Sequence, residues 1–144
     1  MQVEIKVMEE ATKPYAVLYT NEITEEILQL VELIGSAGGV ITATYEEKTI
    51  VLKAKDIYMI RVENNKTMIY CKEQSYVSKK RLLELEKILK GSFMKISKTT
   101  LVNLDYIVSA ESTFGGMMCL ALKNGCKDYV SRKYLPDLKR YLGI

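Results

Sequence analysis

Histidine and tryptophan are absent from this 144-residue sequence, and there are only two phenylalanines. Histidine is the most common general base and metal ligand, so its absence excludes a Ser-His-Asp or Cys-His arrangement and any zinc site that uses histidine. Carboxylate or lysine chemistry stays open, but no nucleophile stands beside a base. We therefore expect no enzymatic activity, no metal or other cofactor and no small-molecule substrate.

Long apolar runs and export signals are also missing. No stretch approaches the roughly 18 apolar residues of a membrane span, and the start, MQVEIKVMEE, lacks the basic segment and apolar core of a secretory signal. The three cysteines, Cys71, Cys119 and Cys126, are an odd number without a CxxC pair. These features predict a cytoplasmic protein with reduced thiols.

Charge is divided unequally along the chain. Residues 1–50 contain three lysines and nine glutamates, a net charge of −6, whereas residues 51–144 contain eighteen Lys and Arg against nine Asp and Glu, a net charge of +9; the sum is the overall +3. A basic segment joined to an acidic one fits a protein that binds a polyanion and turns its acidic part away from it. Two solvated subdomain faces would give the same charges, so charge alone leaves both interpretations open.

The first 47 residues predict an acidic β-β-α leader. Residues 3–7 alternate apolar and polar side chains, as a strand does, and residues 15–20 are a second β-rich run. Residues 22–34 have apolar side chains at helical spacing, and a glycine-rich stop follows. A further short strand candidate lies at 40–45. We expect the leader, residues 1–47, to act in dimerisation or regulation.

Residues 48–144 predict a separate, mainly β domain with short helices, so the fold class is α+β. Short runs of β-forming residues recur at regular intervals between turn signals, which is typical of an all-β unit. Ser78 followed by KKRLLELEKILKG predicts a helix that stops at Gly91, and residues 135–144 predict a closing helix. The expected strands are 49–53, 57–62, 67–72, 76–77, 93–96, 101–103, 106–110, 117–122 and 129–131.

The basic residues of this domain fall mostly in predicted loops and at the starts of elements, beside hydroxyl and amide side chains. Lysine and arginine neutralise phosphates, while short polar side chains fix the register on DNA. The same cations could instead be a solvated surface, although cations before a helix N-terminus are locally unfavourable. The candidate DNA-binding cations are Lys66, Lys79, Lys80, Lys98, Arg132 and Lys133.

Residues 57–142 resemble the LytTR DNA-binding domain of bacterial response regulators and stand-alone regulators. The resemblance rests on the order and spacing of KDIYMIRVENNKTMIYC, SKKRLLELEKIL, FMKISKTTLVNLDYIVS and LKNGCKDYVSRKYLPDLK. It implies packed β-sheets with one short helix, in which loops enter successive major grooves and bend the DNA, at a cost of about 1–6 kcal/mol. It maps the contacts to Asn65 and Lys66, to Ser97, Lys98 and Thr99, and to Arg132 and Lys133.

The chain differs from the family pattern at one contact loop and at its amino-terminal end. Ser97 and Lys98 stand where members commonly have histidine followed by arginine or asparagine, and lysine lacks the planar fork with which arginine selects guanine. The first fifty residues are too short for a receiver domain, so we expect no phosphorelay control. We expect Phe93 to be a core residue and the amide of Asn103 to fix a turn rather than contact DNA.

These observations predict a sequence-specific duplex DNA-binding transcription regulator that acts as a homodimer on two repeated half-sites. The alternative, from another class, is a protein-interaction module whose acidic leader docks a small membrane protein or another regulatory partner, with weak DNA binding. A steep fall of binding with salt would favour the first, because counterions are released when phosphates are neutralised. Capture of a partner without DNA would favour the second.

Overall fold

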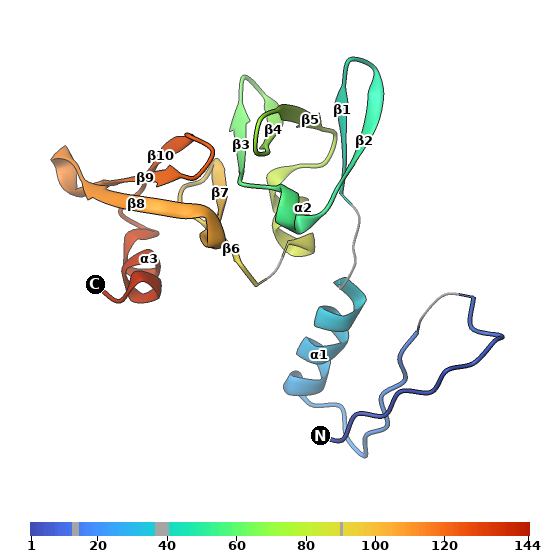
Figure 1. Ribbon diagram of the computed structural model, residues 1–144. Coiled ribbons are helices and arrows are strands. Elements are labelled where there is room, and N and C mark those ends of the chain that lie inside the picture. The colour runs from blue at the N-terminus through green and yellow to red at the C-terminus, as the bar shows by residue number, and fades with distance from the viewer. Residues whose placement is uncertain (13–14, 37–40, 90) are drawn as a thin grey trace. The chain divides into compact units, whose positions relative to one another are not determined.

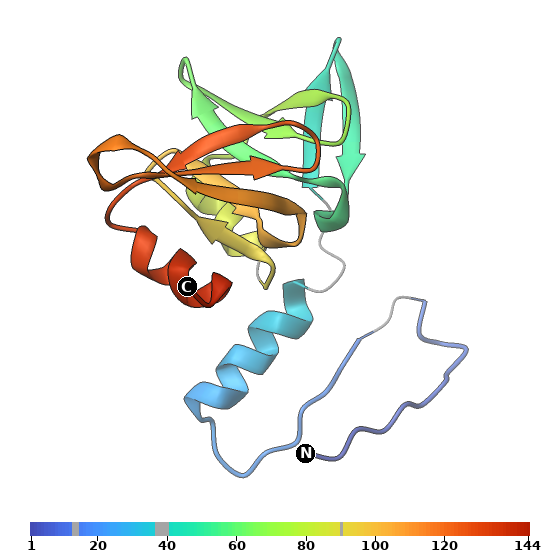
Figure 2. The same ribbon diagram turned by 60° about the vertical axis from the view of Figure 1, so that its left-hand side comes forward.

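The computed structural model describes residues 1–12, 15–36, 41–89 and 91–144. Contacts within the chain divide it into two units, Met1–Ala37 and Gly38–Ile144. The described strands and two of the described α-helices belong to the second unit, which is mainly β with short helices, as the sequence predicts. Figures 1 and 2 show this unit from two directions.

The N-terminal unit contains helix α1 (Glu25–Ser36). This confirms the helix predicted for residues 22–34, with a start slightly later along the chain. The Thr24 hydroxyl accepts a 3.3 Å hydrogen bond from the amide of Ile27, and a threonine that does so satisfies one of the amides that a helix leaves open at its start.

Two of the three strands predicted within residues 1–47 are wrong. Residues 3–7 and 15–20 form no strand in the described part of the chain, and Val3, Ile5 and Val7 are between 83% and 97% exposed. A strand needs a partner for its N–H and C=O groups and a surface that covers its apolar side. The alternating sequence pattern provides the apolar side but no partner, so the expected β-β-α leader contains a helix without the two strands.

The boundary expected between residues 47 and 48 falls inside a hairpin of the second unit. β1 (Ile41–Tyr45) pairs over its whole length with β2 (Lys48–Leu52). The turn between them, Glu46-Glu47, has positive φ angles of 48° and 66°. Asn and Gly usually provide this backbone conformation, so two glutamates gave no turn signal in the sequence.

Two antiparallel sheets form the second unit. The seven-stranded sheet has the order β2-β1-β5-β4-β3-β7-β6, and the three-stranded sheet has the order β10-β9-β8. Short 3-10 turns, η1 (Ala54–Asp56), η2 (Leu104–Tyr106) and η3 (Phe114–Gly116), join some of the strands. The remaining elements are β3 (Met59–Glu63), β4 (Lys66–Tyr70), β5 (Ser75–Ser78), α2 (Leu82–Ile88), β6 (Phe93–Lys95), β7 (Thr100–Asn103), β8 (Ile107–Ser112), β9 (Met118–Leu122), β10 (Lys127–Val130) and α3 (Leu135–Leu142).

The seven-stranded sheet is buried on both faces at its centre. On one face, Ile60 and Leu101 pack in a core with the α2 residue Leu85, and Phe93 packs against that core as expected. On the other face, Met59 packs in a second core that the three-stranded sheet and the α3 residue Leu138 complete. Adjacent residues of β3 point to opposite faces, as strand geometry requires. The two cores hold the ends of β3, β4 and β7 in fixed positions.

Candidate nucleic-acid interface

Strand register brings most of the predicted DNA-binding residues to one end of the seven-stranded sheet. Glu63 pairs with Lys66 at the end of the β3–β4 hairpin, and Thr67 pairs with Ser78, the last residue of β5. Arg61 pairs with Thr100, so β7 begins at this end as well. We call this the basic end, because its connections carry Lys66, Lys79, Lys80 and Lys98.

An acidic turn joins the two strands at one edge of the sheet. Thr44 of β1 pairs with Val77 of β5, and the exposed Glu46-Glu47 turn follows, with Lys48 after it. Figures 1 and 2 show the β1–β2 turn and the β3–β4 turn on the same side of the unit. The strand β5 lies between the two hairpins in the sheet.

The hairpin tip between β3 and β4 projects from the basic end. Asn64 and Asn65 have φ angles of 51° and 61°, the left-handed pair of a tight hairpin turn. Asparagine tolerates this conformation better than most residues, which is why the sequence pattern predicts the turn. The side chains of Asn65 and Lys66 are exposed, so both can reach a ligand outside the fold.

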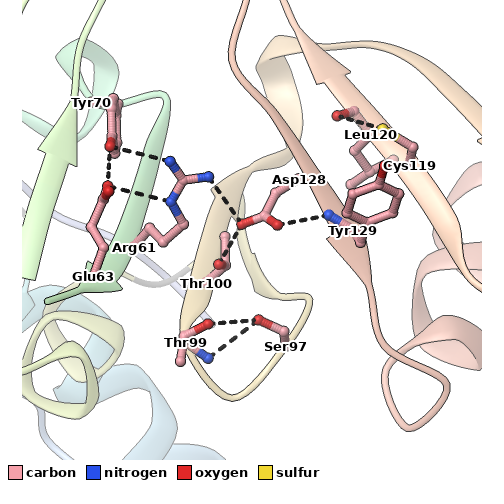
Figure 3. A network of polar contacts seen from close by, with 10 residues as sticks. All are labelled: Arg61, Glu63, Tyr70, Ser97, Thr99, Thr100, Cys119, Leu120, Asp128 and Tyr129. Carbon is pink, nitrogen blue, oxygen red and sulfur yellow. Dashed lines mark hydrogen bonds and ion pairs between the residues drawn. The ribbon is translucent and has the colours of Figure 1, made fainter.

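The loop between β6 and β7 is fixed to the hairpin by its backbone. The carbonyl oxygen of Thr99 accepts a 2.8 Å hydrogen bond from the amide of Val62. Within the loop, the Ser97 hydroxyl accepts a 3.2 Å hydrogen bond from the Thr99 amide and lies 3.3 Å from the Thr99 hydroxyl (Figure 3). These contacts leave Lys98 exposed at the apex of the loop.

The segment after β10 lies beside the same loop. The amide of Ser131 donates a 2.9 Å hydrogen bond to the carbonyl oxygen of Ile96. Arg132 donates from Nε (2.9 Å) and from Nη2 (2.5 Å) to the carbonyl oxygen of Gly115, in the turn between β8 and β9. The ammonium group of Lys133 lies 5.5 Å from the centre of the Tyr134 ring. The structure thus brings the hairpin, the 97–99 loop and the 131–133 segment side by side.

Lys79 and Lys80 precede helix α2. Lys80 donates from its amide to the Ser78 hydroxyl at 3.0 Å, and both lysine side chains are exposed. The residue before α2, Arg81, makes no side-chain capping hydrogen bond. Three successive cations therefore stand at the positive end of the helix dipole, where an anionic ligand would relieve their repulsion.

A polar network that the sequence analysis missed joins the two sheets (Figure 3). Arg61 lies 3.4 Å from Glu63 and 3.5 Å from Asp128, and its Nη2 donates to the Tyr70 hydroxyl at 3.2 Å. The Tyr70 hydroxyl in turn donates to the Glu63 carboxylate. Burial raises the pKa of the Tyr70 phenol, and its hydrogen bond to Glu63 raises it further.

This network explains why the acidic Glu63 at the basic end need not repel a polyanion. Its carboxylate accepts from Tyr70 and forms an ion pair with Arg61, whose side chain is 30% exposed. Arg61 is therefore held by protein groups and is a structural residue of the interface. An arginine between Ile60 and Val62 was the available sequence signal, but its partner Asp128 is 67 positions away, beyond any local pattern.

Two further expectations concern ions and membranes. Across the described ranges, His, Cys, Asp and Glu side chains form no group of three or more that could hold a metal ion. None of the helices in those ranges is long and apolar enough to span a bilayer.

Comparison with known proteins adds an independent line of evidence. The family model described as LytTr DNA-binding domain matches residues 47–143. An HTH-type transcriptional regulator of Staphylococcus aureus strain MSSA476 is 26% identical over 146 residues, covering 100% of this chain and 99% of that protein. The name of that relative refers to a helix-turn-helix. In the present chain, the candidate contacts instead lie on loops between strands and next to a short helix.

Two sensory transduction proteins match only part of their own length. LytR of Streptococcus mutans is 32% identical over 105 residues, covering 72% of this chain and 43% of LytR. LytT of Bacillus anthracis is 30% identical over 100 residues, covering 69% of this chain and 41% of LytT. The solved LytTr DNA-binding domain of a Bacillus cereus methyl-accepting/DNA response regulator superposes with a TM-score of 0.68 at 23% identity, over 73% of this chain and 97% of that one. This likeness confirms the fold.

Proposed function

The chain belongs to the LytTr DNA-binding domain family, and we propose that it contacts duplex DNA with the loops of its basic end and with the segment after β10. It is a DNA-binding transcription regulator. The observation that supports the proposed interface is the continuity of three segments. Backbone hydrogen bonds of 2.8 and 2.9 Å join the β3–β4 hairpin to the 97–99 loop and that loop to Ser131.

Each segment offers an exposed cation together with small polar groups. Lys66, Lys98 and Lys133 neutralise phosphates, whereas Asn65 and the hydroxyls of the 97–99 loop fix register and reach base edges. Because the segments are fixed to one another, they can enter successive major grooves only if the DNA bends toward them. Bending costs about 1–6 kcal/mol and makes recognition depend on the flexibility of the sequence between contacts.

Arg132 and Lys133 have different proposed roles. Arginine has five N–H donors, and Arg132 already directs two of them to the Gly115 carbonyl. Its remaining donors suit a base edge or a phosphate held in one orientation. Lys133 is exposed beside Tyr134 and suits a phosphate approached from several directions.

We further propose that the protein binds as a homodimer on two repeated half-sites. The leader offers a surface for this, because Leu28, Val31 and Ile34 of α1 are 57%, 52% and 42% exposed. Exposed apolar side chains at helical spacing are typical of a helix that packs on a partner. The relatives are bacterial, and bacterial chromosomal DNA lies in the cytoplasm, so the proposed location is the cytoplasm.

The test is a mobility-shift titration of purified protein on its own promoter fragment across a salt series. Lys98→Ala and the double variant Arg132→Ala with Lys133→Ala should weaken binding, and each lost phosphate contact should reduce the salt slope by about 0.9. Lys48→Ala is the matched control, since Lys48 is exposed on β2, the edge strand across the sheet from β7. Binding no tighter than to random DNA, or insensitive to both interface variants, would contradict the proposal.

A further inference from the structure

The turn between β8 and β9 presents a phenylalanine to solvent. Phe114 is fully exposed, at 102%, and Met117 in the same turn is 36% exposed. Leaving a phenylalanine side chain in water forgoes the free energy that its burial would provide, which is among the larger contributions of any residue. A fully exposed aromatic ring on a turn with a fixed conformation therefore indicates a ligand that covers the ring.

This turn is held in one conformation by hydrogen bonds at both sides. The amide and the hydroxyl of Thr113 donate to the carbonyl oxygen of Met117, at 2.9 and 3.0 Å. Gly115 and Gly116 have φ angles of 80° and 74°, a backbone conformation that residues other than glycine rarely adopt. Arg132 holds the carbonyl of Gly115 from outside. We call residues 113–117 the aromatic tip.

Strand register places the aromatic tip beside the proposed DNA-binding segment. Met118, the first residue of β9, pairs with Ser112 on one side and with Val130 on the other. The β8–β9 turn and the residues that follow β10 therefore leave the three-stranded sheet at the same end. The bond from Arg132 to Gly115 then makes the tip continuous with the 131–133 segment, the 97–99 loop and the hairpin.

The charge of the surroundings selects the ligand. The neighbouring exposed side chains along this row, Arg132, Lys133 and Lys98, are cations. A ligand that covers an apolar ring among cations must combine apolar surface with negative charge. Duplex DNA does so, because deoxyribose rings and base edges lie between its phosphates, and apolar side chains can wedge between base steps in the minor groove.

We propose that Phe114 is a further DNA contact, an apolar wedge that packs against bases in the minor groove next to the groove reached by Arg132 and Lys133. The inference rests on the proposed function and extends it to a groove that the cationic loops do not occupy. Partial unstacking by the ring favours a kink, which brings the cationic loops onto successive grooves. Arg132 takes part in both contacts, because it is itself a proposed DNA contact and its hydrogen bonds to Gly115 hold the aromatic tip in place.

The chain contains no tryptophan, so Phe114→Trp creates a single fluorescent reporter at the tip. Titration with promoter DNA, followed simultaneously by tryptophan emission and by anisotropy of labelled DNA, should quench the emission in step with binding as the indole stacks on bases. Tyr45→Trp is the control: Tyr45 lies in the seven-stranded sheet beside its edge strand β2, whereas the tip belongs to the three-stranded sheet, and the emission of the control should stay unchanged. Emission that stays unchanged in Phe114→Trp while anisotropy reports binding would overturn the wedge and leave the DNA-binding proposal intact.

A second variant measures what the ring contributes. Phe114→Ala should weaken binding by about tenfold, with the salt slope unchanged because no cation is removed, and the DNA bend measured by end-to-end energy transfer should decrease. Wild-type affinity and bend in Phe114→Ala would overturn the inference, as would an altered monomer–dimer equilibrium without DNA, which would assign the tip to a protein partner. Failure of the wild-type protein to bind the promoter at all would instead overturn the proposed function.

Discussion

The hydroxyl of Thr100 donates a 2.6 Å hydrogen bond to the carboxylate of Asp128, and this contact joins the seven-stranded sheet to the three-stranded sheet. Thr100 is fully buried at the start of β7, directly after the 97–99 loop. Asp128 lies in β10, four positions before Arg132. The bond therefore fixes the distance between two of the segments proposed to bind DNA.

Replacing Thr100 with valine keeps the shape of the side chain and removes the donor. A hydrogen bond to a charged group contributes about 1.5–3 kcal/mol, and Asp128 keeps its contact with Arg61, so we expect the free energy of unfolding to fall by about 1–2 kcal/mol. Urea denaturation measures the change. Thr49→Val, on the exposed side of β2, is the control and should change stability by less than about 0.5 kcal/mol. A Thr100→Val protein as stable as wild type would show that the bond contributes nothing.

Asn103 fixes a turn, as the sequence predicts. It is 3% exposed, its Nδ2 donates to the carbonyl oxygen of Ile57 at 2.9 Å, and its Oδ1 accepts from the amide of Asp105 at 3.1 Å. Asn103→Ala leaves both backbone groups without their side-chain partner, and we expect a loss of about 2 kcal/mol. β7 begins at the basic end and finishes at Asn103, so DNA affinity of the folded variant should match wild type in a titration well below its melting temperature. A specific loss of affinity would make Asn103 a DNA contact.

Most of the second unit could be predicted because its strands carry their signals locally. Residues 49–53, 67–72 and 117–122 are short runs rich in β-forming and apolar residues between turns, and they became β2, β4 and β9 within one or two residues. The leader shows the limit of such local signals. Residues 3–7 alternate apolar and polar side chains, but pairing depends on a neighbouring strand, and alternation alone does not supply one.

The site was predictable where its chemistry lies in the connections. Turn residues and cations at 64–66 and 97–99 are visible in the sequence, and their positions follow from strand ends. The network of Arg61 and Asp128 was not, because it depends on how two sheets pack. Phe114 was missed for a related reason: its exposure results from the Gly115-Gly116 turn and from the hold of Arg132 on it, and a lone phenylalanine between strands is usually a core residue.

Cys71 should react slowly with alkylating reagents. Burial, and to a lesser extent the negative charge of Asp56, raises the pKa of its thiol from 9.0 to about 11. The thiolate is the reactive form, so the alkylation rate at Cys71 should keep rising toward about pH 11, whereas in denaturant it should level off near the ordinary pKa. Mass spectrometry of alkylated peptides measures this. A rate that levels off near pH 9 in the folded protein would contradict the prediction.

The same shift has a consequence for stability. The folded state favours the neutral thiol, so the unfolded chain loses its proton first as the pH rises. The contribution of Cys71 is therefore fully present below about pH 9 and is lost as the pH rises toward about 11. Wild type should lose more stability than Cys71→Ser across this window, because serine does not ionise there. Equal losses in the two proteins would show that other groups carry the dependence.

Substitutions at Lys80 should show whether a cation that favours DNA binding lowers the stability of the folded protein. A cation before the N-terminus of α2 opposes the helix dipole, so Lys80→Glu should raise the free energy of unfolding by about 0.3–1 kcal/mol. The same change places a negative charge in the proposed interface and should weaken DNA binding by more than Lys80→Ala does. Lys87→Glu is the matched control, because Lys87 is exposed in the last turn of the same helix. There the dipole favours a cation, so the control should lose stability. If Lys80→Glu also lost stability and bound DNA like wild type, Lys80 would be a residue of the solvated surface. DNA binding would then not explain why three cations precede α2.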